Sequence, residues 1–386
     1  MRLINRILDI NLPKRQSAFL WGARKTGKTT YLKMKFPSSI VYDFLKTDLF
    51  FEVAKRPYLL REWLLAKPAH LLKQPIILDE VQKVPEVLNE VHWLIENKQL
   101  QFILCGSSAR KLKRRSTNLL GGRAWHYRMV PFVSIELKDK FNLLKALNRG
   151  MIPSHYLGEN YRMSLKAYVE DYLKEEILAE GLARNIPAFS RFLETFAYSH
   201  GEITNYSNIA RDCGVDAKTV KEYFQILIDT LLAVRVEPFR KKRSRQIITK
   251  ASKYYLFDVG VAGFLRKRHL EEERGEEFGR AFEHFILMEI YAYRSYKMKD
   301  FEINFWRTKS GLEVDFLLDR GRIAVEVKGA ERLDRNSFKG ILAFREEHSP
   351  QRSIVVCREK ERRIYKNIEV IPYKEFLKEL WSERVV

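Results

Sequence analysis

The stretch LWGARKTGKTTYL, residues 20–32, places a glycine-containing turn between an apolar run and the start of a predicted helix. Residues 22–29 fit the spacing G-x-x-x-x-G-K-T without a mismatch. The two glycines allow the backbone to bend so that successive N–H groups converge on one anion, and the following helix turns its positive end toward that anion. The stretch therefore predicts a strand, a loop that cradles nucleotide phosphates, and a helix.

The side chains of this loop predict the cation contacts of a nucleotide site. Lys28 is expected to reach the β- and γ-phosphates and to act in catalysis, and the Thr29 hydroxyl is expected to hold Mg²⁺. The alternative, a plain glycine turn, is disfavoured because a buried strand precedes the loop and a helix start follows it. We expect ATP to contact Gly22, Ala23, Arg24, Lys25, Thr26, Gly27, Lys28, Thr29 and Thr30.

An acidic pair supplies the second element that such a site needs. The apolar run IILDE, residues 76–80, reads as a strand that ends in two carboxylates. Asp79 is expected to bind ATP-bound Mg²⁺ through water, and Glu80 to orient and polarise the attacking water as a catalytic residue. A strand that merely ends in a solvated acidic pair is the alternative, and the phosphate loop upstream makes it less favoured.

Two further segments carry weaker signals for the same site. The predicted strand at residues 101–105 is followed by Ser107 and Ser108, either of which could contact the γ-phosphate or hold the water, although turn serines are equally compatible with the pattern. Arg123 follows a glycine pair and is a candidate for neutralising transition-state charge, across a subunit boundary if the chain forms a homo-oligomer.

The composition indicates a folded basic protein with a polyanionic partner. The 386 residues suffice for two or three domains, and 46% of them are hydrophobic. Lys and Arg total 70 against 49 Asp and Glu, a formal net charge of +21. This excess favours nucleic acid first and an acidic membrane surface second. Of the two nucleic acids, DNA is the expected partner over RNA. Basicity that serves only solubility is the alternative.

Cysteines and apolar runs exclude several other classes of protein. The three cysteines, Cys105, Cys213 and Cys357, are too far apart to support a disulfide framework or a zinc site. The first six residues lack the apolar core of a signal peptide, and no apolar stretch approaches the roughly 20 residues of a membrane span. We therefore expect a cytoplasmic protein without a membrane partner.

The middle of the chain predicts a winged helix-turn-helix. Between residues 189 and 253, a helix, a short helix closed by Gly214 and a longer helix capped by Asp216 follow one another. A basic hairpin, FRKKRSRQIITKASKYYLF at 239–257, comes next. A solvated basic loop is the alternative for this hairpin. The residues expected to contact nucleic acid are Lys218, Thr219, Lys221, Arg240, Lys241, Lys242, Arg243 and Arg245.

The last third carries a second set of carboxylates. WRTKSGLEVDFLLDRGRIAVEVKG, residues 306–329, reads as two alternating strands joined by a turn. A hairpin would bring Asp315, Glu326 and Lys328 together, and Glu283 in a predicted helix could add a third carboxylate. The three carboxylates suit Mg²⁺ or Mn²⁺, and Lys328 is a candidate catalytic residue beside a metal-bound water. Charged residues that simply face solvent are the alternative.

Taken together, in the order in which they occur along the chain, these motifs resemble a family of prokaryotic AAA+-like P-loop ATPases with a C-terminal PD-(D/E)xK nuclease-like domain. The resemblance covers essentially the whole chain and rests on GARKTGKTTYL, IILDEVQKVPEV, ILCGSSARKL, LLGGRAWHYRMVPFVSIEL, KYYLFDVG, LEVDFLL and AVEVKG. It implies an ATPase core, a winged-helix segment and then the nuclease-like fold. It also implies nucleotide contacts at residues 22–30, Mg²⁺ contacts at Thr29 and Asp79, and a catalytic role for Glu80.

The fold class expected is α/β. Residues 1–150 should form an AAA+-like P-loop domain with a parallel sheet, 151–260 a helical linker and winged helix-turn-helix, and 261–386 an α/β PD-(D/E)xK nuclease-like domain. The function expected is ATP hydrolysis coupled to action on nucleic acid, with an Mg²⁺- or Mn²⁺-dependent nuclease-like domain. The alternative is an ATP-dependent switch or scaffold whose last domain is catalytically inactive and only binds DNA or a protein partner.

Overall fold

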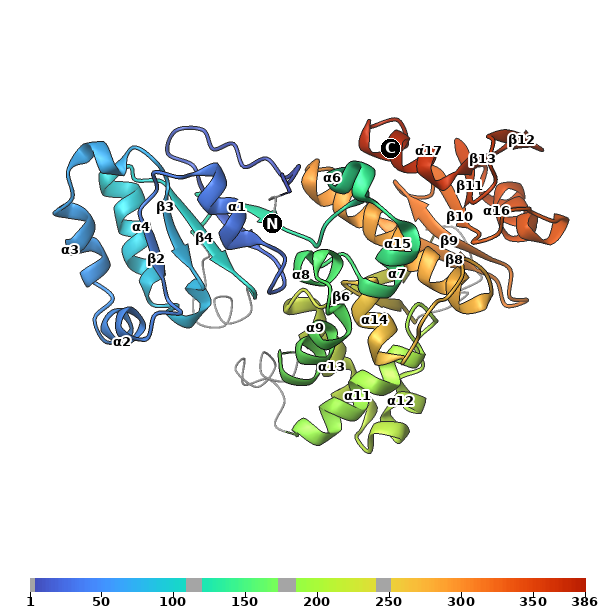
Figure 1. Ribbon diagram of the computed structural model, residues 1–386, viewed down its shortest axis with the longest axis horizontal. Helices are drawn as coiled ribbons and strands as arrows, with labels where there is room; N and C mark the ends of the chain where they lie inside the picture. Colours follow the sequence, from blue (N-terminus) through green and yellow to red (C-terminus); the bar gives the residue numbers. More distant parts are fainter. Residues whose placement is uncertain (1–3, 109–119, 173–184, 241–250) are drawn as a thin grey trace. The chain divides into compact units, whose positions relative to one another are not determined.

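The computed structural model of the chain divides into two compact units, both traced in Figure 1. The residues that the structure describes are 4–108, 120–172, 185–240 and 251–386. The first unit comprises Met1–Pro131 with Asp229–Leu232, and the second comprises Phe132–Ile228 with Ala233–Val386.

The first unit is a parallel five-stranded sheet in the order β2-β3-β4-β1-β5. Its strands are β1 Ser17–Trp21, β2 Val41–Asp43, β3 Ile76–Asp79, β4 Phe102–Gly106 and β5 Ala124–Arg128. Its helices are α1 Lys28–Lys35, α2 Thr47–Lys55, α3 Leu59–Leu65 and α4 Val87–Lys98, with short 3₁₀ turns η1 Ala69–Leu72 and η2 Val81–Lys83. The predicted parallel sheet of a P-loop domain is confirmed.

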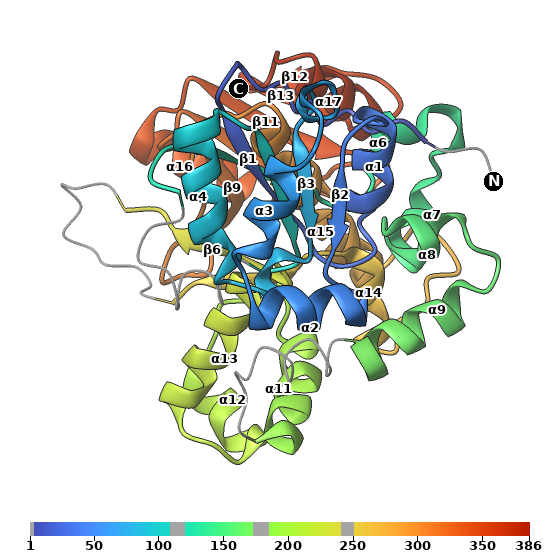
Figure 2. The ribbon, with the colours of Figure 1, turned by 90° about the vertical axis from the view of Figure 1, so that its left-hand side faces the viewer.

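The strand order determines which loops meet at the carboxyl edge of this sheet. Strands β1, β3 and β4 are buried along their whole length, as expected for parallel strands covered on both faces. Helices α1 and α4 flank the strands on opposite sides (Figure 2). Because β4 lies between β1 and β3, the residues after these three strands converge at one edge, where ligands bind in open α/β sheets.

The second unit contains an eight-stranded mixed sheet in the order β12-β13-β11-β10-β9-β8-β6-β7. Its strands are β6 Ala233–Pro238, β7 Lys253–Leu256, β8 Ile303–Arg307, β9 Glu313–Leu318, β10 Ile323–Val327, β11 Arg352–Cys357, β12 Arg363–Tyr365 and β13 Ile368–Pro372. Strand β6 pairs antiparallel with β7 and parallel with β8, so the predicted hairpin strands and the last third of the chain share one sheet. The boundaries at residues 150 and 260 stay predictions.

Helices precede and cover this sheet. The first group is α6 Ser134–Leu137, η3 Lys138–Lys140, α7 Leu143–Arg149, α8 Pro153–Leu157, α9 Tyr161–Ala167, the π-turn η4 Tyr168–Tyr172, α11 Ile186–Tyr198, α12 Tyr206–Cys213 and α13 Ala217–Asp229. The second group is α14 Val259–Leu265, α15 Glu276–Tyr296, η5 Arg335–Phe338, α16 Lys339–His348 and α17 Tyr373–Trp381. A helical segment followed by an α/β region therefore follows the P-loop domain, as predicted.

A buried carboxylate joins three helices of the second unit. Glu289 on α15 accepts hydrogen bonds from the Ser134 backbone N–H at the start of α6 (2.7 Å) and from Nε1 of Trp381 at the end of α17 (2.7 Å). Burial raises the pKa of Glu289 to about 7, although both donors favour the ionised form. One side chain thus holds Ser134, which is 155 positions away in sequence, and Trp381, which is 92 positions away.

Within the described residues, no helix has both the length and the apolar character required to cross a membrane.

Candidate ATP site and acidic cluster

The phosphate loop has the backbone geometry that its glycines predict. Strand β1 ends at Trp21 and α1 begins at Lys28, with Gly27 in the left-handed region at φ 95°. A Cβ added to Gly22 would lie 2.4 Å from the backbone oxygen of Met129, so a larger residue would clash there. Both glycines are therefore required by the local structure, one for its backbone conformation and one for close approach.

The loop lysine points back into its own loop. Lys28 is buried, and its Nζ donates to the carbonyl oxygens of Gly22 (2.7 Å) and Ala23 (3.2 Å). Thr26 Oγ1 donates to the same Ala23 oxygen (2.8 Å) and braces the turn. The ammonium group thus lies inside the loop, where the sequence predicts that phosphate binds.

One hydrogen bond joins the loop helix to the acidic strand. Thr29 Oγ1 donates to Oδ2 of Asp79 across 2.7 Å, and the Glu80 backbone N–H donates to Oδ1 of Asp79 (3.0 Å). The two predicted Mg²⁺ ligands of the ATP site are therefore in contact. A hydroxyl and a carboxylate beside a phosphate loop are hard oxygen donors, which fit Mg²⁺ that arrives with a nucleotide.

Glu80 is held by a residue that the sequence analysis did not assign. Gln82 is buried, and its Nε2 donates to Oε2 of Glu80 (2.6 Å) and to Oγ of Ser107 (3.0 Å). A Cβ on Gly106 would lie 2.4 Å from Gln82 Oε1, so this glycine makes room for the amide. Burial raises the pKa of Glu80, while Lys28 lowers it. The phrase DEVQ was the only sequence signal for Gln82.

The remaining predicted ATP-site residues differ in exposure. Ser108 is buried after β4, Arg24 is half-buried, and Lys25 and Thr30 are exposed. Arg123 forms an ion pair with Glu96 within the first unit. This contact engages its guanidinium on the surface of the same unit, and the predicted role of Arg123 toward a nucleotide stays a prediction.

The residues predicted to contact nucleic acid lie partly in described segments. Asn205 caps α12, Gly214 ends it at φ 67°, and Asp216 Oδ1 accepts from the backbone N–H of Thr219 (2.7 Å) at the start of α13. Lys218, Lys221 and Arg240 are exposed, whereas Thr219 is half-buried. Four of the predicted residues lie outside the described segments: Lys241, Lys242, Arg243 and Arg245.

The carboxylates on the C-terminal hairpin come together as the alternating pattern predicts. Strands β9 and β10 pair antiparallel, with Val325 opposite Phe316, so that Asp315 and Glu326 occupy opposed positions. Both are buried; Asp315 Oδ2 accepts from the Val327 backbone N–H (2.7 Å), and Glu326 Oε1 accepts from Lys328. Burial, with the neighbouring Asp315 charge, raises the pKa of Glu326 to about 8.

Glu283 and Glu313 lie near Asp315 and Glu326. These four carboxylates form the acidic cluster. Glu283 on α15 accepts from the Tyr255 hydroxyl (2.6 Å), and burial raises its pKa to about 7. Lys253 pairs with Glu313 and lies 4.0 Å from Glu283. Burial would lower the pKa of Lys253, but the carboxylates raise it above its ordinary value.

The predicted metal ligands Glu283, Asp315 and Glu326 stay a prediction. Across the described segments, no group of three or more His, Cys, Asp or Glu side chains is arranged to hold a metal ion. In the structure Glu283 accepts a hydrogen bond from Tyr255, and the Lys253 ammonium lies 4.0 Å from it. Neither of these two residues was assigned from sequence, although both belong to the motif KYYLFDVG.

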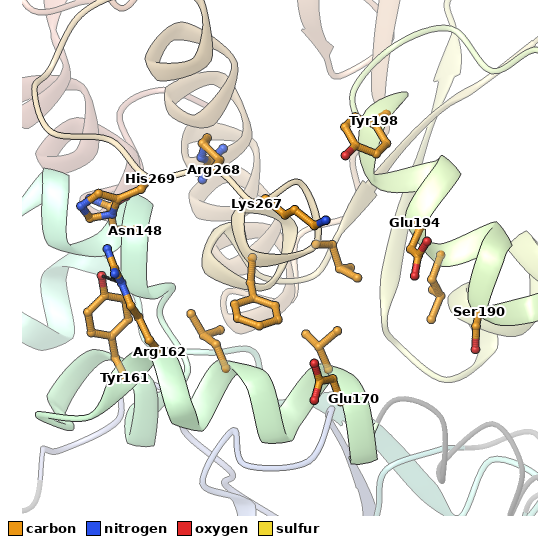
Figure 3. A pocket seen from close by; sticks show the side chains of 15 residues that line it. Asn148, Tyr161, Arg162, Glu170, Ser190, Glu194, Tyr198, Lys267, Arg268 and His269 are labelled. Carbon is orange, nitrogen blue, oxygen red and sulfur yellow. Dashed lines mark hydrogen bonds between the residues drawn. The ribbon is translucent and has the colours of Figure 1, made fainter.

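A pocket of about 800 Å³ lies in the helical segment, where no functional residue was predicted (Figure 3). Figure 3 shows Tyr161 and Arg162 near Asn148 and His269 at one side of the pocket, and Glu194 and Tyr198 on another helix at the opposite side. Its apolar lining is Leu165, Val169, Leu193, Phe264 and Leu265. The volume suits a small molecule, but the rim carries charges of both signs and does not define a ligand class.

Comparison with protein families assigns the first unit and leaves the rest without an activity. Residues 14–138 match an AAA domain, and together with the parallel sheet and phosphate loop this match makes the N-terminal part an AAA-type P-loop ATPase domain. Residues 141–272 and 278–376 match two domains of unknown function, DUF8612 and DUF4143. Neither description names a nuclease or a DNA-binding activity.

Individual relatives are distant. Uncharacterized proteins of Mycobacterium bovis and Mycobacterium tuberculosis are each 22% identical over 254 residues, which cover 63% of this chain and 56% of each relative. The chain thus matches little more than half the length of these relatives. A STAND-class signal transduction ATPase with a tetratricopeptide repeat sensor from Pyrococcus horikoshii is 14% identical, with 74% of this chain and 48% of that chain covered. Its TM-score of 0.19 is too low to support any inference.

The contacts of Gln82 generate a prediction for ATP turnover. Gln82→Met keeps the side-chain length but removes the N–H donors that join Glu80 to Ser107, so Glu80 should lose its orientation. We expect kcat for ATP hydrolysis to fall about tenfold or more, with the affinity for ATP nearly unchanged. Phosphate release and binding of a fluorescent ATP analogue measure the two quantities.

A matched variant controls for the loss of a glutamine amide. Among the described residues, Gln101 Nε2 donates to backbone oxygens of Pro13 and Gln16 in the same unit and not to Glu80. Gln101→Met should leave kcat near the wild-type value. A Gln82→Met protein that turns over ATP like wild type would show that this amide does not position Glu80.

Proposed function

We propose that the chain hydrolyses ATP and couples hydrolysis to action on nucleic acid, DNA rather than RNA. The observation that carries the ATPase part is the contact of Thr29 with Asp79 beside a loop whose lysine is buried within it. Support for a nucleic-acid partner comes from the net charge of +21 and from exposed basic residues in the helical segment.

In the proposed reaction, residues of the first unit divide the work on the nucleotide. Lys28 exchanges its loop carbonyls for phosphate oxygens and stabilises the developing negative charge. Thr29 and Asp79 would hold Mg²⁺, which supplies further charge neutralisation when bound. Glu80 accepts a hydrogen bond from the attacking water and orients it. Burial raises the pKa of this carboxyl group. Ser107, joined to Glu80 through Gln82, directly follows β4, the strand that lies between β1 and β3.

Substitutions in this site should separate nucleotide binding from turnover. Lys28→Ala should abolish tight ATP binding, because the phosphates lose their main cationic partner in a buried site. Glu80→Gln should still bind ATP while hydrolysis falls about a hundredfold or more. Calorimetric titration with ATP and a phosphate-release assay distinguish these effects. Normal turnover by Glu80→Gln would assign the water-orienting role to another residue.

The nucleic-acid part of the proposal places the contact on a winged helix-turn-helix. Helices α12 and α13 are followed by the antiparallel pair β6 and β7, an order that suits this class of DNA-binding module. Lys218 and Lys221 are exposed in the first turns of α13, and Arg240 is exposed just after β6. Lys221 also lies 5.3 Å from the Tyr206 ring. These cations suit contacts to phosphate oxygens.

DNA binding should depend steeply on salt. Each contact to a DNA phosphate makes the slope of log affinity against log salt concentration more negative by about 0.9, because the counterions bound to that phosphate are released. Combined alanine substitution of Arg240, Lys241, Lys242 and Arg243 should flatten the slope measured by fluorescence anisotropy on a short duplex.

A control removes the same number of charges elsewhere. Four exposed lysines of the C-terminal region supply it: Lys360, Lys366, Lys374 and Lys378. Their replacement by alanine should leave the slope unchanged. Equal flattening by both sets would mean that binding follows total charge and not the hairpin.

Cleavage of a phosphodiester by the C-terminal region is a second candidate function. The observation that favours it is Oε2 of Glu326, a buried oxygen without a hydrogen-bond partner in the described segments, on a strand position opposite Asp315. Two opposed carboxylates fit one Mg²⁺ or Mn²⁺, which would activate water and offset phosphate charge. Lys328 pairs with Glu326 beside this position. The alternative is a domain that binds DNA or a protein partner without cutting.

Cleavage assays decide between these alternatives. Wild type should cut plasmid or linear DNA with Mg²⁺ or Mn²⁺, and Asp315→Asn or Lys328→Ala should lose cutting while ATP hydrolysis stays near normal. Gel time courses with and without ATP measure this. Absence of cutting by wild type in every nucleotide state, or equal cutting by the variants, would leave the binding or scaffold role.

A further inference from the structure

An arginine outside the phosphate loop holds one of the carbonyl groups of the loop. Arg6 lies in the segment before β1 and is half-buried, and its Nη1 donates to the carbonyl oxygen of Thr26 (2.6 Å). Its Nη2 donates to the carbonyl oxygens of Val130 (2.6 Å) and Pro131 (3.0 Å), which follow β5. One guanidinium group thus joins the loop to the chain segment at the end of the first unit.

The segment that receives Arg6 is itself fixed to the parallel sheet. Met129 directly follows β5, and its backbone N–H donates to the carbonyl oxygen of Trp21 at the end of β1 (2.7 Å). On the other side of β1, the Gly22 N–H donates to the carbonyl oxygen of Gly106 in β4 (3.2 Å). The loop is therefore attached to both neighbours of β1, directly to β4 and through Arg6 to the residues after β5.

The carbonyl group that Arg6 holds belongs to the same peptide group as the Gly27 N–H. In a trans peptide the C=O and the N–H point in opposite directions, so the hydrogen bond to Thr26 directs the Gly27 N–H away from the guanidinium. Gly27 has a φ of 95°, and a glycine offers little steric resistance to rotation of this peptide group. Arg6 supplies that resistance, and it keeps its contact when Lys28 exchanges its loop carbonyls for phosphate oxygens.

We propose that Arg6 is a positioning residue for nucleotide phosphates: it fixes the peptide group between Thr26 and Gly27 so that the Gly27 N–H can donate to a phosphate oxygen. This role rests on the proposed ATP site and adds to it a residue from outside the loop. Backbone N–H groups of such loops bind the α- and β-phosphates, which ATP and ADP share. Arg6 therefore contributes equally to the binding of both nucleotides, whereas Glu80 acts on the γ-phosphate.

The test compares nucleotide affinity with turnover in the full chain. Isothermal titration calorimetry gives the dissociation constants of ATP and ADP with Mg²⁺, and phosphate release at saturating ATP gives kcat. Arg6→Met removes the guanidinium but keeps an unbranched side chain. Both dissociation constants should rise by the same factor, about tenfold, with kcat within about twofold of the wild-type value. A merely structural defect would lower kcat through loss of active protein and would leave the dissociation constants of the folded fraction unchanged.

A matched control separates the loop contact from attachment of the N-terminal segment. Lys35 on α1 pairs with Asp9 of that segment (2.6 Å), and among the described residues it donates no hydrogen bond to the loop. Lys35→Met should bind ATP and ADP as wild type does. Equal weakening by Lys35→Met and Arg6→Met would overturn the role of Arg6, because docking of the segment would then account for both.

The remaining outcomes separate this role from the ATPase proposal. Wild-type affinities in a folded Arg6→Met protein overturn the role of Arg6 and leave the ATPase standing. If Arg6→Met does not fold, Arg6→Lys decides, because one ammonium cannot reach the Thr26 and Val130 oxygens through separate nitrogens. Weaker binding of both nucleotides by Arg6→Lys supports the role, and wild-type binding overturns it. A wild-type chain that binds nucleotides without hydrolysing ATP contradicts the ATPase alone, and one that binds neither nucleotide overturns both proposals.

Discussion

The ATP site depends on the hydrogen bond between Thr29 and Asp79, 2.7 Å long, which joins α1 to β3 although β4 lies between β1 and β3. It can form only when the parallel sheet has this order and register. Asp79 is buried, so loss of the contact would leave a carboxylate with fewer partners in a poorly solvated site. The residues that would bind Mg²⁺ therefore also hold α1 against β3, so the same contact serves the ATP site and the packing of the sheet.

Buried charge is the corresponding constraint in the second unit. The acidic cluster brings four carboxylates from α15, β9 and β10 near two lysines, and burial raises the pKa of Glu283 and Glu326. Charged groups are costly to desolvate, and a fold with apolar residues at the same positions is often as stable or more stable. Their gathering at one end of a hairpin supports the proposed binding of a cation or a charged partner.

Features that depend on neighbours in sequence were predictable, and features that depend on distant partners were not. The phosphate loop follows from its glycine spacing, and the Asp315–Glu326 pairing follows from the period of two in adjacent strands. Gln82 was missed because its partner Ser107 lies 25 residues away, and Lys253 because Glu313 lies 60 residues away. A sequence pattern also does not reveal that Tyr255 and Lys253 contact Glu283, whose expected role as a metal ligand stays a prediction. The basic residues at 241–245 lie outside the described segments.

The central claim is that this chain turns over ATP under the control of nucleic acid. The most direct measurement is steady-state phosphate release by the unaltered chain with Mg²⁺, with and without duplex DNA, at low and at high salt. The account predicts a basal rate that DNA raises at low salt, and loss of that increase at high salt as phosphate contacts weaken. No phosphate release under any of these conditions would contradict the ATPase assignment, and a rate indifferent to DNA at low salt would contradict the coupling.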